Sequence, residues 1–269
     1  MVSIAVCGAC GRMAGQVIRR AVEGNDIKIV AAVDINNMGR DIGEVLGVGR
    51  LGVTVVGVDR LDAELKSKKP QLLVDFTMPE ACVSNVKIAT ANKVSVVVGT
   101  TGLSEAQLNE INTAVKKANV AGMISSNFSI GMNVLFKMAG EAARALKGYD
   151  IEIIEAHHNK KKDAPSGTAV TLAKIMEKEL GRELSKDAVY GRQGMIGERK
   201  AGEIGIHAIR AGDIAGEHTV LFGATGERLE LKYMAHSRDA FAMGCVRAIV
   251  WMGKQKPGMY EMSDVLGLK

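Results

Sequence analysis

The fold is decided in residues 2–14, which read VSIAVCGACGRMA. An apolar run ends at Cys7, and a glycine-rich turn then leads into a helical pattern that begins at Arg12. The order G-x-x-G-x-x-A is a variant of the dinucleotide fingerprint, in which glycines let the backbone approach a pyrophosphate at a helix N-terminus. We therefore expect a cofactor-binding turn formed by Gly8, Ala9, Cys10, Gly11, Arg12 and Met13.

A carboxylate follows the second apolar run of the chain. That run, Ile27 to Val33, predicts a buried strand, and Asp34 stands at its end. In dinucleotide-binding folds, an acidic residue about 20 residues after the glycine turn accepts hydrogen bonds from the adenosine ribose. The alternative is a plain strand–helix turn with a surface aspartate, but the position and order of these features favour a cofactor site.

The first half of the chain predicts a parallel sheet, and therefore an α/β fold. Apolar runs at residues 71–76, 95–98 and 120–124 alternate with helical patterns at 80–91 and 104–117. The carboxyl ends of parallel strands face the ligand crevice. We expect further cofactor contacts there from Gly99, Thr100, Thr101, Ser125, Ser126, Asn127 and Phe128. The Phe128 ring is expected to cover the nicotinamide, with a position in the core as the alternative. The glycine-rich stretch from Ile35 to Val53 is interpreted as a loop.

The pattern changes in the second half. Helical periodicity at residues 130–146 and 166–180 is interleaved with strand patterns at 151–156, 204–210, 218–222 and 228–234. Short strands joined by glycine-containing turns predict a mixed, mostly antiparallel sheet in an α+β domain. A last amphipathic helix is expected at 239–251. We predict a dinucleotide-binding domain at 1–127, completed by 237–269, and a substrate-binding domain at 128–236.

Composition narrows the function classes. The 269 residues carry a formal charge of +5 and only 4% aromatic residues, which favours a small anionic substrate over nucleic acid. Cys7 and Cys10 have no second pair at zinc-site spacing, so no metal is expected. The absence of a signal peptide and of an apolar run of about 18 residues predicts a cytoplasmic enzyme without a membrane partner.

The most informative stretch is residues 155–168, EAHHNKKKDAPSGT. A predicted strand ends at His157 and His158, a basic turn follows, and Ser166 precedes a helix whose N-terminus is suited to an anion. Histidine supplies a proton near neutral pH, and a lysine does so among other cations. A solvated basic loop and structural histidines are the alternatives. One metal on both histidines is poor geometry, because neighbouring strand residues point to opposite faces.

These motifs resemble the 4-hydroxy-tetrahydrodipicolinate reductase (dihydrodipicolinate reductase) family. The resemblance runs nearly from end to end. It rests on Gly8 to Met13, Asp75-Phe76-Thr77, Gly99 to Gly102, Asn127-Phe128-Ser129, Glu155 to His158, Lys161 to Thr168, Arg210 to Ile214, Gly216-Glu217-His218 and Ser237-Arg238. The sequence alone assigns no role to the polar stretches at Arg210 to Asp213 and Gly216 to His218, which are candidates for subunit contacts.

The resemblance implies a reaction and a site. It implies hydride transfer from NAD(P)H to a cyclic imine dicarboxylate, in lysine and diaminopimelate biosynthesis, by a homotetramer that associates through the sheets of its second domain. His157 is implied as proton donor or acceptor and Lys161 as proton donor, while His158, Gly167 and Thr168 contact substrate carboxylates. Because the two half-sites lie in different domains, domain closure is a further expectation.

One departure from the family concerns the cofactor. Ile35 and Met78 stand where some members have an arginine, and the Asp34 carboxylate disfavours a 2′-phosphate. We therefore expect NADH to be preferred and NADPH to remain usable through Arg12. The competing readings are another two-domain dehydrogenase, such as an aspartate or homoserine dehydrogenase, and a non-catalytic NADH-binding redox sensor. The sensor would need a DNA-reading or interaction segment, for which the sequence offers no candidate.

Overall fold

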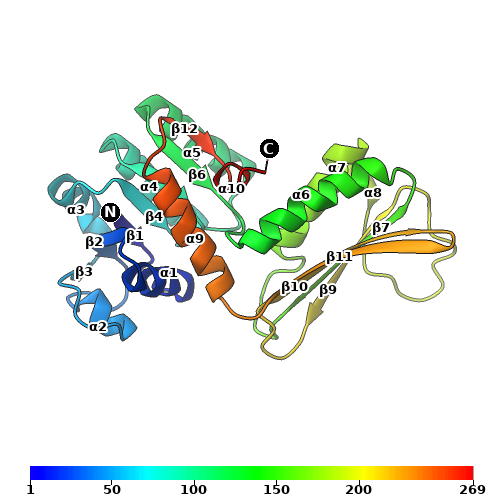
Figure 1. Cartoon of the computed structure of the whole chain (residues 1–269), viewed down its shortest axis with the longest axis horizontal. Coiled ribbons are helices and arrows are strands. Elements are labelled where there is room, and N and C mark those ends of the chain that lie inside the picture. Colours follow the sequence, from blue (N-terminus) through cyan, green and yellow to red (C-terminus); the bar gives the residue numbers. More distant parts are fainter. Residues whose placement is uncertain (269) are drawn as a thin grey trace. The chain divides into compact units, whose positions relative to one another are not determined.

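The structure is a computed structural model that describes residues 1–268 (Figure 1). The chain forms two compact units. The first contains residues 1–129 together with the segment that begins at Asp239, and the second contains residues 130–238. Within the described residues, no helix is long and apolar enough to cross a membrane.

The first unit is built on a parallel sheet of seven strands in the order β12-β6-β5-β4-β1-β2-β3. Its strands are β1 Val2–Cys7, β2 Ile27–Val33, β3 Val55–Val56, β4 Leu72–Asp75, β5 Ser95–Val98, β6 Ala121–Ile124 and β12 Gly258–Tyr260. The expected parallel sheet is confirmed. The strand order reverses between β1 and β4, and in doubly wound folds a ligand crevice lies outside the strand ends at that point.

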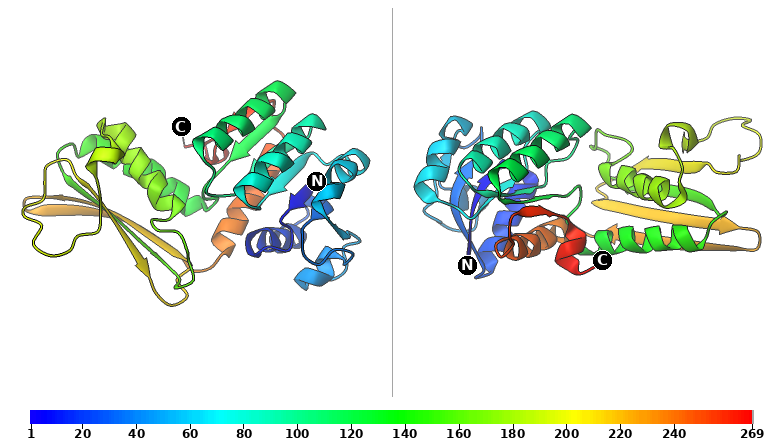
Figure 2. Two further views of the ribbon diagram at one scale, coloured as in Figure 1. Left: turned by 180° about the vertical axis from the view of Figure 1, so that it is seen from behind. Right: turned by 90° about the horizontal axis from the view of Figure 1, so that it is seen from above.

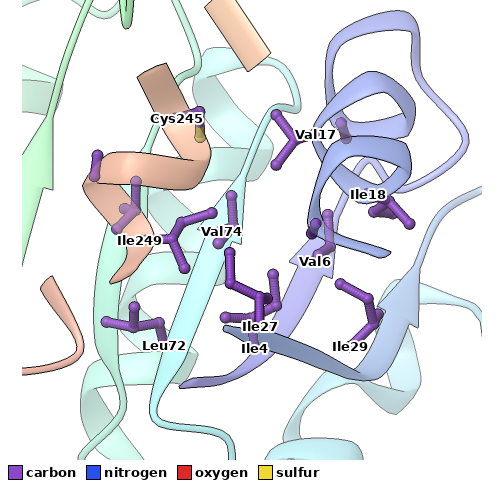
Figure 3. Packing of buried hydrophobic residues seen from close by; sticks show 14 of the residues in the cluster. Ile4, Val6, Val17, Ile18, Ile27, Ile29, Leu72, Val74, Cys245 and Ile249 are labelled. Atoms are coloured by element: carbon purple, nitrogen blue, oxygen red, sulfur yellow. The ribbon is translucent and has the colours of Figure 1, made fainter. Parts of the chain in front are cut away.

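Helices cover both faces of this sheet. They are α1 Arg12–Glu23, α2 Ile42–Leu46, α3 Leu61–Lys68, α4 Pro79–Ala91, α5 Glu105–Ala118, α9 Asp239–Met252 and α10 Met262–Leu266, with a 3₁₀ turn at Val58–Arg60. Ile4 and Val6 of β1 pack in one cluster with residues of α1 and α9 (Figure 3), whereas Ala5 and Cys7 pack in another with residues of α3, α4 and α5. Burial on both faces explains why the strands read as continuous apolar runs.

The segment at 35–53, expected to be a loop, contains the short helix α2. The Asp41 side chain accepts the N–H groups of Gly43 and Glu44 at the start of this helix. The same carboxylate also accepts the N–H groups of Leu51 and Val53, which closes the loop. A helix of five residues is too short to leave a periodic pattern, and for that reason the sequence did not indicate it.

The second unit contains a five-stranded sheet in the order β11-β10-β7-β9-β8 (Figure 2). Its elements are α6 Ile130–Ala145, β7 Asp150–His157, α7 Gly167–Leu180, α8 Leu184–Asp187, β8 Ala188–Tyr190, β9 Ile204–Arg210, β10 Gly216–Ala224 and β11 Glu227–Ala235. β10 is antiparallel to β7 and β11, while β9 is parallel to β7 and β8. The expected mixed sheet is confirmed, and its antiparallel part is confined to β7, β10 and β11.

Helices α6 and α7 pack on one face of the second sheet. Ile151 and Ile153 of β7 are buried in a cluster with residues of both helices. Because side chains alternate along a strand, Glu155 and His157 project from the same face of β7 as these isoleucines. The strand therefore delivers both polar side chains to the side of the sheet on which α7 begins.

Candidate active site

The turn between β1 and α1 has the geometry that a bound pyrophosphate requires. Gly8 has φ +73°, and a Cβ atom at this position would lie 2.6 Å from the Phe76 carbonyl oxygen. The Gly8 N–H donates to the Val33 carbonyl, and the Gly11 N–H donates to the Gly8 carbonyl. No side chain could replace the glycine at this turn without moving the neighbouring backbone.

Asp34 is tied to this turn by hydrogen bonds. Its Oδ2 accepts the Cys10 N–H at 2.9 Å, and its Oδ1 accepts the Asn36 N–H at 2.8 Å. Helix α1 begins at Arg12 after the N-cap Gly11, and its first turn holds no acidic residue. The positive end of the helix dipole and the exposed Arg12 therefore suit an anion, and Asp34 lies beside them. These residues fit a dinucleotide.

A second part of the expected cofactor set is organised by Asp75 at the end of β4. This fully buried carboxylate accepts the Thr77 and Thr100 hydroxyl groups, each at 2.7 Å. A Cβ atom at Gly99 would lie 2.1 Å from the Phe76 ring, so this glycine makes room for the aromatic side chain. Asp75 was absent from the expected site residues, although an acid at the end of a buried strand is a detectable signal.

The segment after β6 is placed partly in the core. The Ser125 hydroxyl donates to the Asn127 carbonyl at 2.8 Å, and Asn127 is buried. Phe128 is only 3% exposed and packs against Phe76, with ring centroids 6.0 Å apart. Its ring therefore occupies the core position that was the alternative to covering the nicotinamide. Contact of Ser125, Ser126, Asn127 and Phe128 with a cofactor stays a prediction.

The sheet brings the expected cofactor residues to a single edge. The parallel strands β1, β2, β5 and β6 of one sheet are followed by Gly8 to Met13, Asp34, Gly99 to Thr101 and Ser125 to Phe128, respectively.

The two cysteines at the glycine turn are not arranged as a metal site. Cys7 is buried, and Cys10 Sγ lies 3.5 Å from the Asn36 carbonyl oxygen. Within residues 1–268, no group of three or more histidine, cysteine, aspartate or glutamate side chains is placed to hold a metal.

A buried carboxylate organises the candidate substrate site in the second unit. Glu155 Oε2 lies 2.6 Å from His157 Nδ1, and Oε1 accepts the Ser166 N–H at 2.9 Å. Arg210 donates to both oxygens at 2.8 Å. Burial alone would raise the pKa of Glu155, but the hydrogen bonds from His157, Arg210 and Ser166 lower this pKa to about 2. Glu155 therefore stays ionised at neutral pH.

The basic turn holds Lys161 close to an acid. Lys161 Nζ lies 2.9 Å from Asp163 Oδ1. Burial would raise the pKa of Asp163, but Lys161 lowers it. His158 Nδ1 accepts the Lys160 N–H at 3.2 Å. His157 and Lys161, both expected in catalysis, are thus each held by a carboxylate: Glu155 of β7 contacts His157, and Asp163 of the β7–α7 connection contacts Lys161.

The start of α7 is open to a ligand. Ser166 is the N-cap, and its hydroxyl oxygen accepts the Ala169 N–H at 3.2 Å. Gly167 is exposed, and no atom outside its chain neighbours and its own helix backbone lies within 4 Å of the place where its Cβ would stand. Thr168 is buried directly behind it. No protein atom therefore crowds Gly167 on the side where a side chain would stand, and the N-terminus of a helix suits an anion.

Two residues of the site were missed because the sequence left their stretches unassigned. Arg210 ends β9, pairs in register with His157 and binds Glu155. His218 of β10 is buried, its Nε2 lies 3.2 Å from Ser166 Oγ, and its ring lies 5.3 Å from that of His157. Both side chains thus belong to the candidate substrate site. Arg210 and His218 come close to Glu155 and Ser166 through the register of β7 with β9 and β10. This register cannot be read from the linear sequence.

The chain matches known proteins over its whole length. A family model described as "Dihydrodipicolinate reductase, N-terminus" matches residues 2–128, and one described as "Dihydrodipicolinate reductase, C-terminus" matches residues 131–266. The 4-hydroxy-tetrahydrodipicolinate reductase of Methanocaldococcus jannaschii is 50% identical over 100% of this chain and 98% of that protein. The enzyme of the same name from Methanosarcina barkeri is 49% identical over 100% of both.

Solved structures agree on the fold. The dipicolinate-bound dihydrodipicolinate reductase from Paenisporosarcina sp. TG-14 is similar with a TM-score of 0.75, over 97% of both chains at 24% identity. The doubly wound sheet, the glycine turn and these relatives define an α/β oxidoreductase with a Rossmann-type dinucleotide-binding domain. The chain belongs to the dihydrodipicolinate reductase family.

The buried His218 makes the stability of the protein depend on pH. Burial, followed by the charge of His157, lowers the pKa of His218 to about 3. The unfolded chain binds this proton below about pH 6.5, so between that pH and 3 it binds more protons than the folded chain, and acid destabilises the fold. Going from pH 7 to pH 5 should cost on the order of 2 kcal/mol through this group.

This cost should disappear in His218→Gln. Urea unfolding at both pH values measures the change. His236→Gln, at an exposed histidine, is the control and should keep the wild-type loss. An equal loss of stability in wild type and His218→Gln would show that His218 is not the group responsible.

Proposed function

We propose that this protein reduces 4-hydroxy-tetrahydrodipicolinate to tetrahydrodipicolinate with a reduced nicotinamide cofactor, in lysine and diaminopimelate biosynthesis. The substrate gains a hydride and a proton, and its 4-hydroxyl group leaves as water. The observation that carries the proposal is the stretch from the end of β7 to the start of α7, where His157 and Lys161 precede a helix start that is capped by Ser166 and has open space at Gly167. This combination suits a small dicarboxylate that must be held by positive groups and protonated. Relatives that bear the name of this reductase, and match the whole chain, support the substrate.

The roles of the chain's own groups follow from their contacts. The bound nicotinamide supplies the hydride. The start of α7, with Gly167 and Thr168, and the His158 side chain bind the carboxylates. His157 uses Nδ1 for Glu155, so Nε2 is the nitrogen left to face the substrate. Either His157 or Lys161 delivers the proton that completes the reduction. Positive charge around the substrate also stabilises the negative charge that develops during hydride addition.

A turnover assay tests this proposal. Wild-type protein should consume reduced cofactor, followed by absorbance, only when the aldolase-derived substrate is present. Lys161→Ala should lower kcat by about 100-fold, because general acid groups contribute on this scale, while reduced-cofactor binding stays intact. Lys174→Ala, an exposed lysine on α7, is the control and should stay within about threefold of wild type. Binding of the cofactor without any turnover would revive the redox-sensor reading.

We propose that NADH is the preferred cofactor. Asp34 is only 9% exposed and is fixed by the Cys10 and Asn36 N–H groups, so its charge cannot move away from a 2′-phosphate. Ile35, which follows it, is 78% exposed and offers no cation. Arg12 and Arg40 are exposed near the same strand ends and keep NADPH usable.

The wild-type kcat/KM should be about tenfold higher with NADH than with NADPH, which corresponds to about 1.4 kcal/mol. Asp34→Asn keeps an acceptor for the Cys10 N–H but removes the negative charge, so this variant should lower the ratio of kcat/KM with NADH to kcat/KM with NADPH. Ile35→Arg should lower this ratio further, because it raises kcat/KM with NADPH. Equal or better efficiency of the wild type with NADPH would contradict the preference.

We also propose that the chain forms a homotetramer through the second unit. Helices α6 and α7 pack on one face of its sheet, and the opposite face carries a row of Met234, Glu217, Ala156 and Ile209 on β11, β10, β7 and β9, in which every member but Glu217 is apolar. Met234 and Ile209 are about half exposed. Large apolar side chains on an open sheet face indicate a protein contact surface.

Sedimentation should give four times the chain mass for the wild type and a smaller species for Met234→Glu, because a buried carboxylate would oppose association. Val58→Glu, at an exposed position of the first unit, should leave the assembly unchanged. A monomeric wild type would refute this assembly without touching the reaction.

A further inference from the structure

Glu155 contacts two parts of the candidate substrate site with its two oxygen atoms. Oε2 lies 2.6 Å from Nδ1 of His157, which is the proposed proton donor or acceptor. Oε1 accepts the N–H of Ser166, which is the N-cap of α7 and precedes the proposed carboxylate site. One fully buried side chain therefore joins the group that exchanges the proton to the group that holds the substrate.

Arg210 keeps this carboxylate in one orientation. Its Nη1 and Nη2 donate to Oε2 and Oε1 of Glu155, each at 2.8 Å. Such a bidentate pair fixes the plane of a carboxylate as well as its position. Nη2 also donates to the Asp163 carbonyl oxygen at 2.6 Å, so the same guanidinium holds the turn that carries Lys161. Arg210 comes from β9, and the sheet itself thus supports the arrangement.

We propose that Glu155 is a positioning residue that aligns His157 and the N-terminus of α7 for catalysis, with Arg210 holding it in place. Through Oε2 it keeps a proton on Nδ1 of His157, so that Nε2 faces the substrate. Through Oε1 it sets the direction of the first turn of α7. The inference rests on the function proposed above and adds to it two residues that act through their neighbours.

The other groups around His157 are compatible with this role. His218 lies 5.3 Å away, and burial lowers its pKa to about 3, so it stays neutral and does not compete for the charge of Glu155. Lys161 is engaged by Asp163. His157 Nδ1 is thus engaged by the carboxylate of Glu155.

A cycle of two substitutions separates positioning from general stability. Glu155→Gln should lower kcat by about tenfold or more and raise the substrate KM about tenfold, the scale on which orienting neighbours of a site act. In the His157→Ala background, Glu155→Gln should leave kcat within about twofold, because the residue through which it acts is gone, while KM still rises. Independent, multiplicative losses of kcat in the double variant would overturn the proposal.

A matched control exists on the same strand. Glu152 is held by Arg192, Arg199 and His207. Burial alone would raise the pKa of Glu152, but the hydrogen bonds from these three residues lower this pKa to about 2. Glu152→Gln, assayed where sedimentation shows the wild-type oligomeric state, should lose stability as Glu155→Gln does. Its kcat and KM should stay within about threefold of wild type. Similar kinetic losses at both positions would mean that Glu155 acts only through stability.

If Glu155→Gln fails to fold because Arg210 is left with an unpaired charge, the paired variant Glu155→Gln/Arg210→Met takes its place. It removes both charges together and keeps the volume of the arginine stem. The same cycle with His157→Ala then applies, with the same expected kinetics and the same contradicting result.

A measurement without turnover distinguishes this inference from the proposed reaction. Nitrogen-15 NMR of the histidines should show a proton held on Nδ1 of His157 in wild type and lose this preference in the Glu155 variant. Calorimetry should show dipicolinate, a planar dicarboxylate, binding about tenfold more weakly to that variant. These changes without wild-type turnover would refute the reaction but keep the positioning role. Turnover with unchanged NMR and binding would refute the positioning role alone.

Discussion

The parallel pairing of β1 with β2 and β4 is the constraint on which the first unit depends. Because β1 is buried on both faces, its interior can carry only apolar side chains, and polar groups are confined to its ends. The same holds for its neighbours. Glycines and carboxylates therefore collect where the strands stop, and hydrogen bonds such as those of Asp34 and Asp75 connect one strand end to the next. The expected cofactor residues therefore lie together at the carboxyl ends of the parallel strands.

The second unit builds its site by a different physical principle. Here a charged residue is buried beneath the site, and desolvation of Glu155 is offset by Arg210, His157 and the Ser166 N–H. Such a group is costly to leave unpaired, so every contact must form together. The candidate site of the first unit is shaped by backbone turns, in which a side chain larger than that of glycine would collide with the neighbouring backbone. The second orients side chains through an ion pair, where removal of one partner disturbs several others.

Most of the fold could be predicted from local patterns, and the exceptions share a physical reason. The long strands and helices are recognisable from their periodicity. The elements that were not predicted are short and show too few repeats of the pattern: they are α2, α3, α8, α10, β3, β8 and β12. The cofactor turn and the 155–168 stretch were recognisable because their residues are contiguous. Arg210 and His218 were not, since they reach Glu155 and Ser166 from more than fifty positions away, through the sheet. Phe128 lies in a segment that was expected to bind the cofactor, but its side chain is buried in the core.

The return of α9 to the first unit also bears on how the chain is assembled during synthesis. Cys245 and Ile249 of this helix are fully buried in the cluster that contains Val74 and Ile4, so that core stays incomplete until the last part of the chain has emerged. The second unit, in contrast, is one continuous segment. During translation it can bury its own core while the N-terminal strands still wait for their final helix. The segment inserted in the middle of the chain is therefore the part that is free to fold first.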